Sequence, residues 1–259
     1  MKIVRFSTGF ATEYGVLYED AVISIEDSPF EAIKETNRHY RISDVRLLPP
    51  CVPTKIVALG VNYRSHAEEM NDRPPDEPLI FIKPPSSVIG PEDKIIYPPS
   101  SQRVDYEGEL GVVIKSTARQ VSKEEAGNHI LGYTCVNDVT ARDLQAKDKQ
   151  WTRAKGFDTF CPIGPCIETD LSTFALKLET YLNGELKQES YASQLIYPVG
   201  ELVSFVSHVM TLMPGDVIAT GTPEGIGPMQ PGDTIEVKIE EIGTLRNYVV
   251  KPEEPDVKE

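Results

Sequence analysis

VDYEGELGVVI, residues 104–114, places two acids inside an apolar run that reads as a β-strand. Glu107 and Glu109 are two positions apart, and side chains two apart on a strand point to the same face. Two carboxylates at one spot repel each other unless a cation or a proton lies between them. The neighbours expected on the opposite, packed face are Tyr106, Leu110, Val112 and Ile114. The stretch therefore predicts a strand with one core face and one charged face.

A third acid, Asp138, follows the apolar run GYTCVN, where a strand is expected to meet a helix. Three carboxylates suit a hard ion such as Mg²⁺ or Mn²⁺, with water or substrate in the other positions. Simpler explanations exist for each acid. A Glu-x-Glu pair is most often a solvated face, and Asp138 is a candidate N-cap for a helix that starts at Val139. The surrounding sequence is needed to distinguish a metal site from these simpler explanations.

The segments around these acids read as short strands joined by proline-rich turns. The strand-like runs are KIVALG, PLIFIK, KIIYP, GYTCVND, DVIAT and DTIEVKI. Asn183-Gly184 between two alternating runs predicts a hairpin, and the Pro-Gly-Asp turns at Pro214 and Pro231 suit type II turns. A doubly wound sheet would instead need strands that alternate with long helices. We therefore predict a β-dominated α+β fold.

Three segments of the main body have the pattern of helices. They are NYRSHAEEM, VTARDLQAKDKQW and VGELVSFVSHVMTLM. The last is amphipathic, with its apolar face expected at Leu202, Phe205, Val206 and Val209. In the second, Arg142 and Gln145 fall four and seven residues after Asp138, so the three are expected on one helix face.

The chain divides at LLPPCVPTK, a proline-dense stretch that continues neither a helix nor a central strand. Residues 1–50 are predicted to form a small β-rich N-terminal subdomain with one short helix over 30–38. Residues 54–250 form the predicted catalytic domain. The charged, proline-broken end, 251–259, is expected to be a flexible tail.

Composition narrows the classes of function. With 40 acidic against 26 basic residues, the net charge of −14 disfavours nucleic acid and anionic membranes as partners. The N-terminus lacks the apolar segment of a secretory signal, and no apolar run is long enough to cross a bilayer. The four cysteines form no CxxC pair, so reduced thiols and no zinc site are expected. These features predict a cytoplasmic protein.

His66 and Glu69 are three residues apart on the first predicted helix of the main body. That spacing lets the carboxylate hold the imidazole and raise its basicity, which suits a general base. Glu68 is an alternative partner for His66. The segment SHAEEM is also compatible with a charged surface helix that has no functional role.

The motifs in order resemble the fumarylacetoacetate hydrolase family. The resemblance rests on NYRSHAEEM, PLIFIKPPSSVIG, YEGELGVVI, GYTCVNDVTARDLQ, WTRAKGFDTFCPIGP and TGTPEGIG, and it runs from about Lys55 to about Val249. It implies a mixed β-roll catalytic core, a homodimer, and one Mg²⁺ or Mn²⁺ held by Glu107, Glu109 and Asp138. It also implies that Arg142, Gln145 and Lys155 contact substrate or orient the site.

Further residues are candidates around the metal. Lys83, Arg142 and Lys155, the last expected in a KGFD loop, supply positive charge to attract a carboxylate or an enolate. Gly221, Gly225 and Gly227 near a strand end offer backbone N–H groups that can cradle a carboxylate, although a plain turn explains them equally well. The family lines its pocket with a Gly-Thr pair that matches Gly221 and Thr222.

The resemblance also implies a reaction on small 2-oxo acids through a metal-chelated enolate. The His66–Glu69 pair favours hydrolysis of acylpyruvates or decarboxylation of oxaloacetate. The extra N-terminal segment and KGFDTFCPIGP also resemble 2-hydroxyhepta-2,4-diene-1,7-dioate isomerases, which is the alternative. A catalytically silent metal- or carboxylate-binding protein is the rival from another class, although every acid and base of a working site is present.

Overall fold

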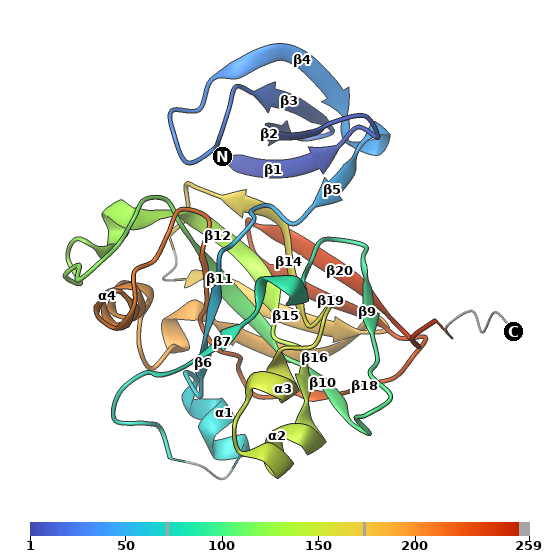
Figure 1. Cartoon of the computed structure of the whole chain (residues 1–259), viewed down its shortest axis with the longest axis vertical. Helices are drawn as coiled ribbons and strands as arrows, with labels where there is room; N and C mark the ends of the chain where they lie inside the picture. The colour runs from blue at the N-terminus through green and yellow to red at the C-terminus, as the bar shows by residue number, and fades with distance from the viewer. Residues whose placement is uncertain (71–72, 173–174, 254–259) are drawn as a thin grey trace, which may run out of the picture.

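A computed structural model describes all residues except 71–72, 173–174 and 254–259. Strands dominate it (Figure 1), in agreement with the predicted β-dominated α+β fold. The α-helices in the described part are α1 (Arg64–Glu69), α2 (Arg142–Asp148), α3 (Thr152–Lys155) and α4 (Val199–Val209). None of these described helices has the length and apolar character needed to span a membrane.

The largest sheet has twelve strands and runs through the whole molecule. Its main path is β4 (Glu35–Arg41), β3 (Ala21–Ile25), β2 (Thr12–Tyr18), β1 (Lys2–Ser7), β14 (Cys161–Glu168), β12 (Ile130–Asn137), β11 (Gly108–Ile114), β17 (Val217–Ala219), β6 (Ile56–Gly60) and β7 (Leu79–Lys83). Off this path, β5 (Arg46–Leu48) pairs with β1, and β8 (Val88–Ile89) pairs with β14. Most neighbours are antiparallel, while β17 runs parallel to β6 and β14 runs parallel to β8.

Two smaller sheets complete the main body. The five-stranded sheet has the order β16 (Glu185–Tyr191), β15 (Lys177–Leu182), β19 (Thr234–Ile239), β20 (Gly243–Val250) and β9 (Lys94–Ile96). The three-stranded sheet has the order β13 (Thr140–Ala141), β10 (Val104–Tyr106) and β18 (Gly227–Met229). The predicted Asn183-Gly184 hairpin joins β15 to β16, and both turn residues have positive φ, as a type I′ turn requires.

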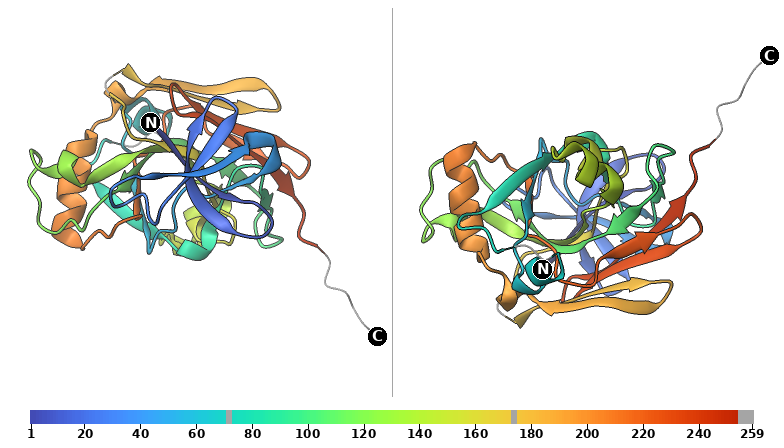
Figure 2. Two further views of the ribbon diagram at one scale, coloured as in Figure 1. Left: turned by 90° about the horizontal axis from the view of Figure 1, so that it is seen from above. Right: turned by 90° about the horizontal axis from the view of Figure 1, so that it is seen from below.

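The N-terminal strands form a lobe at one end of the molecule (Figures 1 and 2). They are not a separate sheet, because Lys2 and Ile3 of β1 pair with Glu168 and Ile167 of β14. Helices α1, α2 and α3 gather at the opposite end (Figure 1). The proposed division between 1–50 and 54–250 stays a prediction, and the predicted tail lies outside the described residues from 254 onward.

Strand β11 is buried on both of its faces. Leu110, Val112 and Ile114 pack in a core cluster that also contains the buried side of α4, and Val113 packs in a second cluster. The predicted packed face is therefore present, except that Tyr106 belongs to a third cluster. The acidic face is also covered by protein, which is why its charges need partners.

Three details differ from the sequence-based expectations. The helix predicted over 30–38 is absent, and residues 35–41 form β4 because pairing with β3 and the packing of Tyr40 on Phe6 outweigh the local helical pattern. In α4, Val209 is exposed and Phe205 is half-buried, while Val203 is fully buried beside Leu202 and Val206. The third difference, the start of α2, bears on the site.

Candidate active site

Three acids meet at the end of the molecule that carries α1, α2 and α3. Glu107 lies between β10 and β11, Glu109 lies in β11, and Asp138 follows β12. The antiparallel register opposes Gly108 to Asn137, and the Asp138 N–H donates to the Glu107 carbonyl oxygen at 2.8 Å. One carboxylate oxygen from each acid lies within 4.8 Å of the others, and all three residues are buried. The pattern of Glu107, Glu109 and Asp138 in the sequence thus corresponds to one cluster in space.

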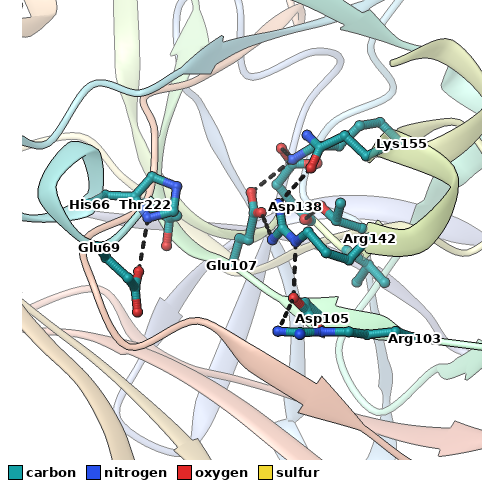
Figure 3. Close-up of polar contacts among 12 residues, drawn as sticks. His66, Glu69, Arg103, Asp105, Glu107, Asp138, Arg142, Lys155 and Thr222 are labelled. Carbon is teal, nitrogen blue, oxygen red and sulfur yellow. Dashed lines mark hydrogen bonds and ion pairs between the residues drawn. The ribbon is translucent and has the colours of Figure 1, made fainter. Parts of the chain in front are cut away.

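Two of the acids are neutralised by buried cations (Figure 3). Lys155 Nζ donates to Glu107 Oε2 at 2.7 Å and to Asp138 Oδ2 at 2.6 Å, and Lys83 Nζ donates to Asp138 Oδ1 at 2.6 Å. Arg142 forms an ion pair with Glu107. Burial by itself raises the pKa of Glu107, but the charges of Lys155 and Arg142 outweigh it and hold the pKa well below its usual range. Glu107 is therefore ionised.

Glu109 is different, since no cation pairs with it in the described part of the chain. Its one hydrogen bond there comes from the Gly221 N–H, at 2.8 Å from Oε2. Burial, followed by the negative charges of Asp138 and Glu107, raises the pKa of Glu109 well above its usual value. A buried carboxylate without an ion-pair partner is stable only if it binds a cation or holds a proton.

The donor set fits a divalent ion. Three buried carboxylates, in or directly beside neighbouring strands, offer hard oxygen ligands, and Glu109 has the fewest partners of the three. Glu107, Glu109 and Asp138 are the residues that would hold Mg²⁺ or Mn²⁺.

A chain of ion pairs fixes Arg142 in place. Asp105 is fully buried and accepts from Arg142 Nε at 2.9 Å and from Arg103 Nε at 2.9 Å (Figure 3). Arg142 also donates to Gln145 Oε1 at 2.7 Å. Attraction by Glu107 and Asp105 outweighs burial and raises the pKa of Arg142. Asp105 was not among the predicted site residues, although its position two residues before Glu107 was the available signal.

Helix α2 starts later than predicted. Residues 140–141 pair with β10, so the helix begins at Arg142 and Asp138 is outside it; the N-cap is Ala141. Arg142 and Gln145 still lie together, as their spacing predicted. Lys155 is the last residue of α3 and not part of a loop, and it is buried.

The His66–Glu69 pair forms on α1. His66 Nδ1 lies 3.1 Å from Glu69 Oε2, which selects Glu69 over Glu68 as the partner. The other oxygen of Glu69 accepts the Gly225 N–H at 2.9 Å, so α1 is tied to the TGTPEGIG loop. His66 and Glu69 face the carboxylate cluster from the side opposite Lys155 and Arg142 (Figure 3).

The TGTPEGIG loop contributes differently from the predicted cradle. The N–H groups of Gly221 and Gly225 are already used by Glu109 and Glu69, so they are not available to a substrate carboxylate. Thr222 Oγ1 donates to the Gly108 carbonyl oxygen at 2.9 Å and accepts from Gln188 Nε2 at 2.8 Å. Gln188, which was not among the predicted residues, is buried and accepts the Gly108 N–H, so it links this loop to the strand that carries Glu109.

These groups surround a cavity of about 120 Å³. Its polar lining includes His66, Glu107, Glu109, Arg142, Gln145, Lys155 and Thr222. Its apolar lining includes Leu59, Phe81 and Trp151. Lys83, predicted to bind substrate, has no exposed surface and donates to Asp138 and to the Val139 carbonyl oxygen, so it lies behind the acids.

The chain is similar to known proteins over nearly its whole length. Residues 55–250 match the family described as Fumarylacetoacetate (FAA) hydrolase C-terminal, and residues 1–50 match Rv2993c-like, N-terminal. One relative is oxaloacetate tautomerase FAHD2B, mitochondrial, of Bos taurus. It is 43% identical over 221 residues, which are 80% of this chain and 70% of the relative.

Solved structures agree with this assignment. The 2-hydroxyhepta-2,4-diene-1,7-dioate isomerase from Mycobacterium marinum is 42% identical, with a TM-score of 0.92, and the match covers 98% of this chain and 100% of that one. Maleylpyruvate hydrolase from Sphingobium sp. SYK-6, in complex with manganese (II) ion and pyruvate, is 28% identical, with a TM-score of 0.81, covering 97% and 99%. The chain belongs to the fumarylacetoacetate hydrolase family, whose members are enzymes.

Proposed function

We propose that the protein is a Mg²⁺- or Mn²⁺-dependent enzyme that interconverts the keto and enol forms of small 2-oxo dicarboxylic acids. The observation that carries this proposal is the buried cluster of Glu107, Glu109 and Asp138, in which Glu109 pairs with no cation among the residues that the structure describes. A bound divalent ion would act as a Lewis acid that polarises the 2-oxo group. The small-molecule substrate and the predicted homodimer are part of the same proposal.

The charge of the site favours a dianionic substrate. Asp105 shares Arg142, so four carboxylates (Asp105, Glu107, Glu109 and Asp138) face four cations, namely Lys83, Lys155, Arg142 and the exposed Arg103. The formal charges of these groups sum to zero before an ion binds, although none of the cations forms an ion pair with Glu109 among the described residues. A divalent ion would leave two positive charges in this partly enclosed cavity. Positive charge in a low-dielectric pocket attracts and orients an anion of matching charge, such as a 2-oxo dicarboxylate.

The chain supplies a base for proton transfer. His66 lines the cavity, and because Glu69 holds its Nδ1, Nε2 is the nitrogen left to exchange a proton with the substrate. In this scheme His66 removes a proton from the carbon next to the 2-oxo group and returns it to the 2-oxo oxygen, which completes the enol and restores the neutral imidazole. Arg142 and Lys155 are placed to hold negative charge on the substrate.

Relatives support proton transfer over the reactions favoured by the sequence alone. One relative is an oxaloacetate tautomerase, and a closely similar structure is an isomerase of 2-hydroxyhepta-2,4-diene-1,7-dioate. Both names describe a rearrangement without loss of a carbon–carbon bond. Decarboxylation of oxaloacetate would use the same electrophilic site, so the two outcomes are separated by the product.

Hydrolysis of acylpyruvates is the second candidate, and the His66–Glu69 pair is the observation that favours it. The same imidazole can take a proton from water, and a maleylpyruvate hydrolase at 28% identity was solved in complex with manganese (II) ion and pyruvate. The reaction would add water to a carbonyl carbon, break the carbon–carbon bond, and yield pyruvate with a carboxylic acid.

The test is an assay of the purified protein with Mg²⁺ or Mn²⁺, and with EDTA as the control. Enol-oxaloacetate, acetylpyruvate and a 2-hydroxy-dienedioate are followed by ultraviolet absorbance and by NMR of the products. We expect metal-dependent loss of the enol signal without release of CO₂. Pyruvate from acetylpyruvate would instead establish the hydrolase. No turnover of any substrate by the metal-loaded protein would reject catalysis and favour a silent binding protein.

A further inference from the structure

A second, larger pocket lies next to the active-site cavity, on the other side of its apolar wall. This outer groove, of about 690 Å³, is lined by β7 from Leu79 to Ile82 and by Pro84, Lys149 and Thr152. Phe81 and Trp151 line both the cavity and the groove. These two rings are therefore the partition between a small polar chamber and a larger open one.

Trp151 is fitted tightly into this partition. Its ring packs edge-on against Phe81, with centroids 5.1 Å apart and planes at 78°. A Cβ added at Gly60 would come within 2.7 Å of the indole Cη2 and Cζ3 atoms, so the ring lies directly on a glycine of β6. The Phe81 ring in turn lies 5.0 Å from Lys155 Nζ. Contacts on both sides hold the indole in place.

We propose that Trp151 sets the maximum chain length of the substrate, so that the enzyme accepts four-carbon 2-oxo dicarboxylates and excludes seven-carbon ones. This inference rests on the proposed function and makes it more specific. The cavity is well below the ~300–1,000 Å³ typical of sites for larger ligands. Without the indole, the cavity would open into the outer groove, whose lining includes Lys149, a cation that suits a distal carboxylate.

Binding measurements test the length limit without relying on turnover. In a His66→Ala background with saturating Mg²⁺, calorimetry gives Kd values for oxaloacetate, 2-oxoglutarate, 2-oxoadipate and 2-oxopimelate. We expect affinity to fall by about tenfold or more for the chain that no longer fits, because a pocket discriminates by about that factor per misfitting methylene. Adding Trp151→Ala should reduce the difference between the four- and seven-carbon acids to less than about threefold.

Two controls keep the test specific. Ile82→Ala alters a residue that lines only the outer groove, so the length preference should stay. Trp151→Phe shrinks the wall without removing it and should give an intermediate preference if Trp151→Ala folds poorly. Because Trp151 is the single tryptophan of the chain, its emission also reports a ligand that reaches the wall. Oxaloacetate with Mg²⁺ should change the emission of the His66→Ala protein.

Each contrary result has a different meaning. Equal affinity for all lengths with Trp151 present, or an equal loss for all acids in Trp151→Ala, would overturn the length limit while leaving the proposed function intact. Failure of every 2-oxo acid to bind in the presence of bound Mg²⁺ would reject the proposed function, and the length limit with it.

Discussion

Two buried carboxylates of this protein, Asp216 and Glu109, have opposite environments. Asp216 lies at the turn before β17 and has no exposed surface. Its Oδ1 accepts the Thr54 N–H at 2.9 Å, the Thr54 hydroxyl at 2.7 Å and the Lys55 N–H at 3.1 Å. Its Oδ2 accepts the Met213 N–H at 2.8 Å and Lys55 Nζ at 2.5 Å. Five donors thus surround one side chain.

Glu109 accepts a single hydrogen bond among the described residues, from Gly221, and faces two other acids. A buried charge is costly unless hydrogen bonds and an opposite charge offset the lost hydration. Asp216 has both and ties the proline-dense segment to the main body. Glu109 has one hydrogen bond and no ion pair among the described residues, as expected for a carboxylate that binds a cation. Both acids are buried, so burial does not distinguish the structural acid from the functional one. The hydrogen bonds and ion pairs around each carboxylate do.

The largest effect is expected from Glu109→Gln. The neutral amide removes one metal ligand, so turnover should fall by about a thousandfold or more. The fold should keep its stability or gain some, because the repulsion with Glu107 and Asp138 is relieved. Activity, metal content and urea unfolding would be measured together. An active Glu109→Gln enzyme would contradict the role of this residue.

The matched change Asp216→Asn should do the reverse. An amide in place of Oδ2 would face the Met213 and Lys55 donors, so we expect a loss of about 3 kcal/mol or more in the free energy of unfolding. Protein that remains folded should keep its activity, since Asp216 does not line the cavity. Unfolding in urea gives the stability. An unchanged urea midpoint in Asp216→Asn would contradict the structural role of Asp216 and its contrast with Glu109.

His66→Ala should lower kcat by about a hundredfold while leaving metal binding unchanged, as expected for the loss of a general base. This variant separates the groups that hold the ion from the group that moves the proton. Metal titration and steady-state kinetics measure the two roles independently, and Glu68→Gln serves as a control on the same helix. Weaker metal binding in His66→Ala would mean that the histidine belongs with the ligands.

Addition of Mg²⁺ should stabilise the protein through Glu109 and have no effect through Asp216. At a hundred times Kd, binding to the folded state contributes about 2.7 kcal/mol. The melting temperature should therefore rise in the wild type and in Asp216→Asn, and it should not move in Glu109→Gln. A rise in Glu109→Gln would place the ion elsewhere. EDTA should reverse the stabilisation.

The smallest effect is in the pH dependence of the metal-free protein. Because the pKa of Glu109 is higher in the folded than in the unfolded chain, its contribution to stability is full below about 4.5 and is lost as pH rises towards the folded pKa. Glu109→Gln should lack this decline. The free energy of unfolding of both proteins from pH 4 upward, in EDTA, shows the difference. Parallel curves would mean that Glu109 has no raised pKa.

Some features were predictable because they depend on neighbours along the chain. The Asn183-Gly184 hairpin and the His66–Glu69 pair are local, so composition and spacing were enough to locate them. The three acids were predicted to converge because Glu107 and Glu109 flank one strand residue and Asp138 follows the apolar run GYTCVN, and the resemblance implied that all three are ligands. The helix over 30–38 was wrong, since pairing with β3, a distant effect, decides that segment.

The sequence by itself determined the β-dominated fold class, the acidic cluster and the family of the chain. Each depends on the alternation of apolar and polar residues, on turn residues or on the order of motifs, which can be read along the chain. Only the tertiary structure decided which charges are matched. It showed Asp105 holding Arg142, Lys83 behind the acids, and Trp151 resting on Gly60. These relations join residues from different strands and helices, and the pKa of a buried group depends on all charges that folding brings near it. No spacing along one segment contains that information.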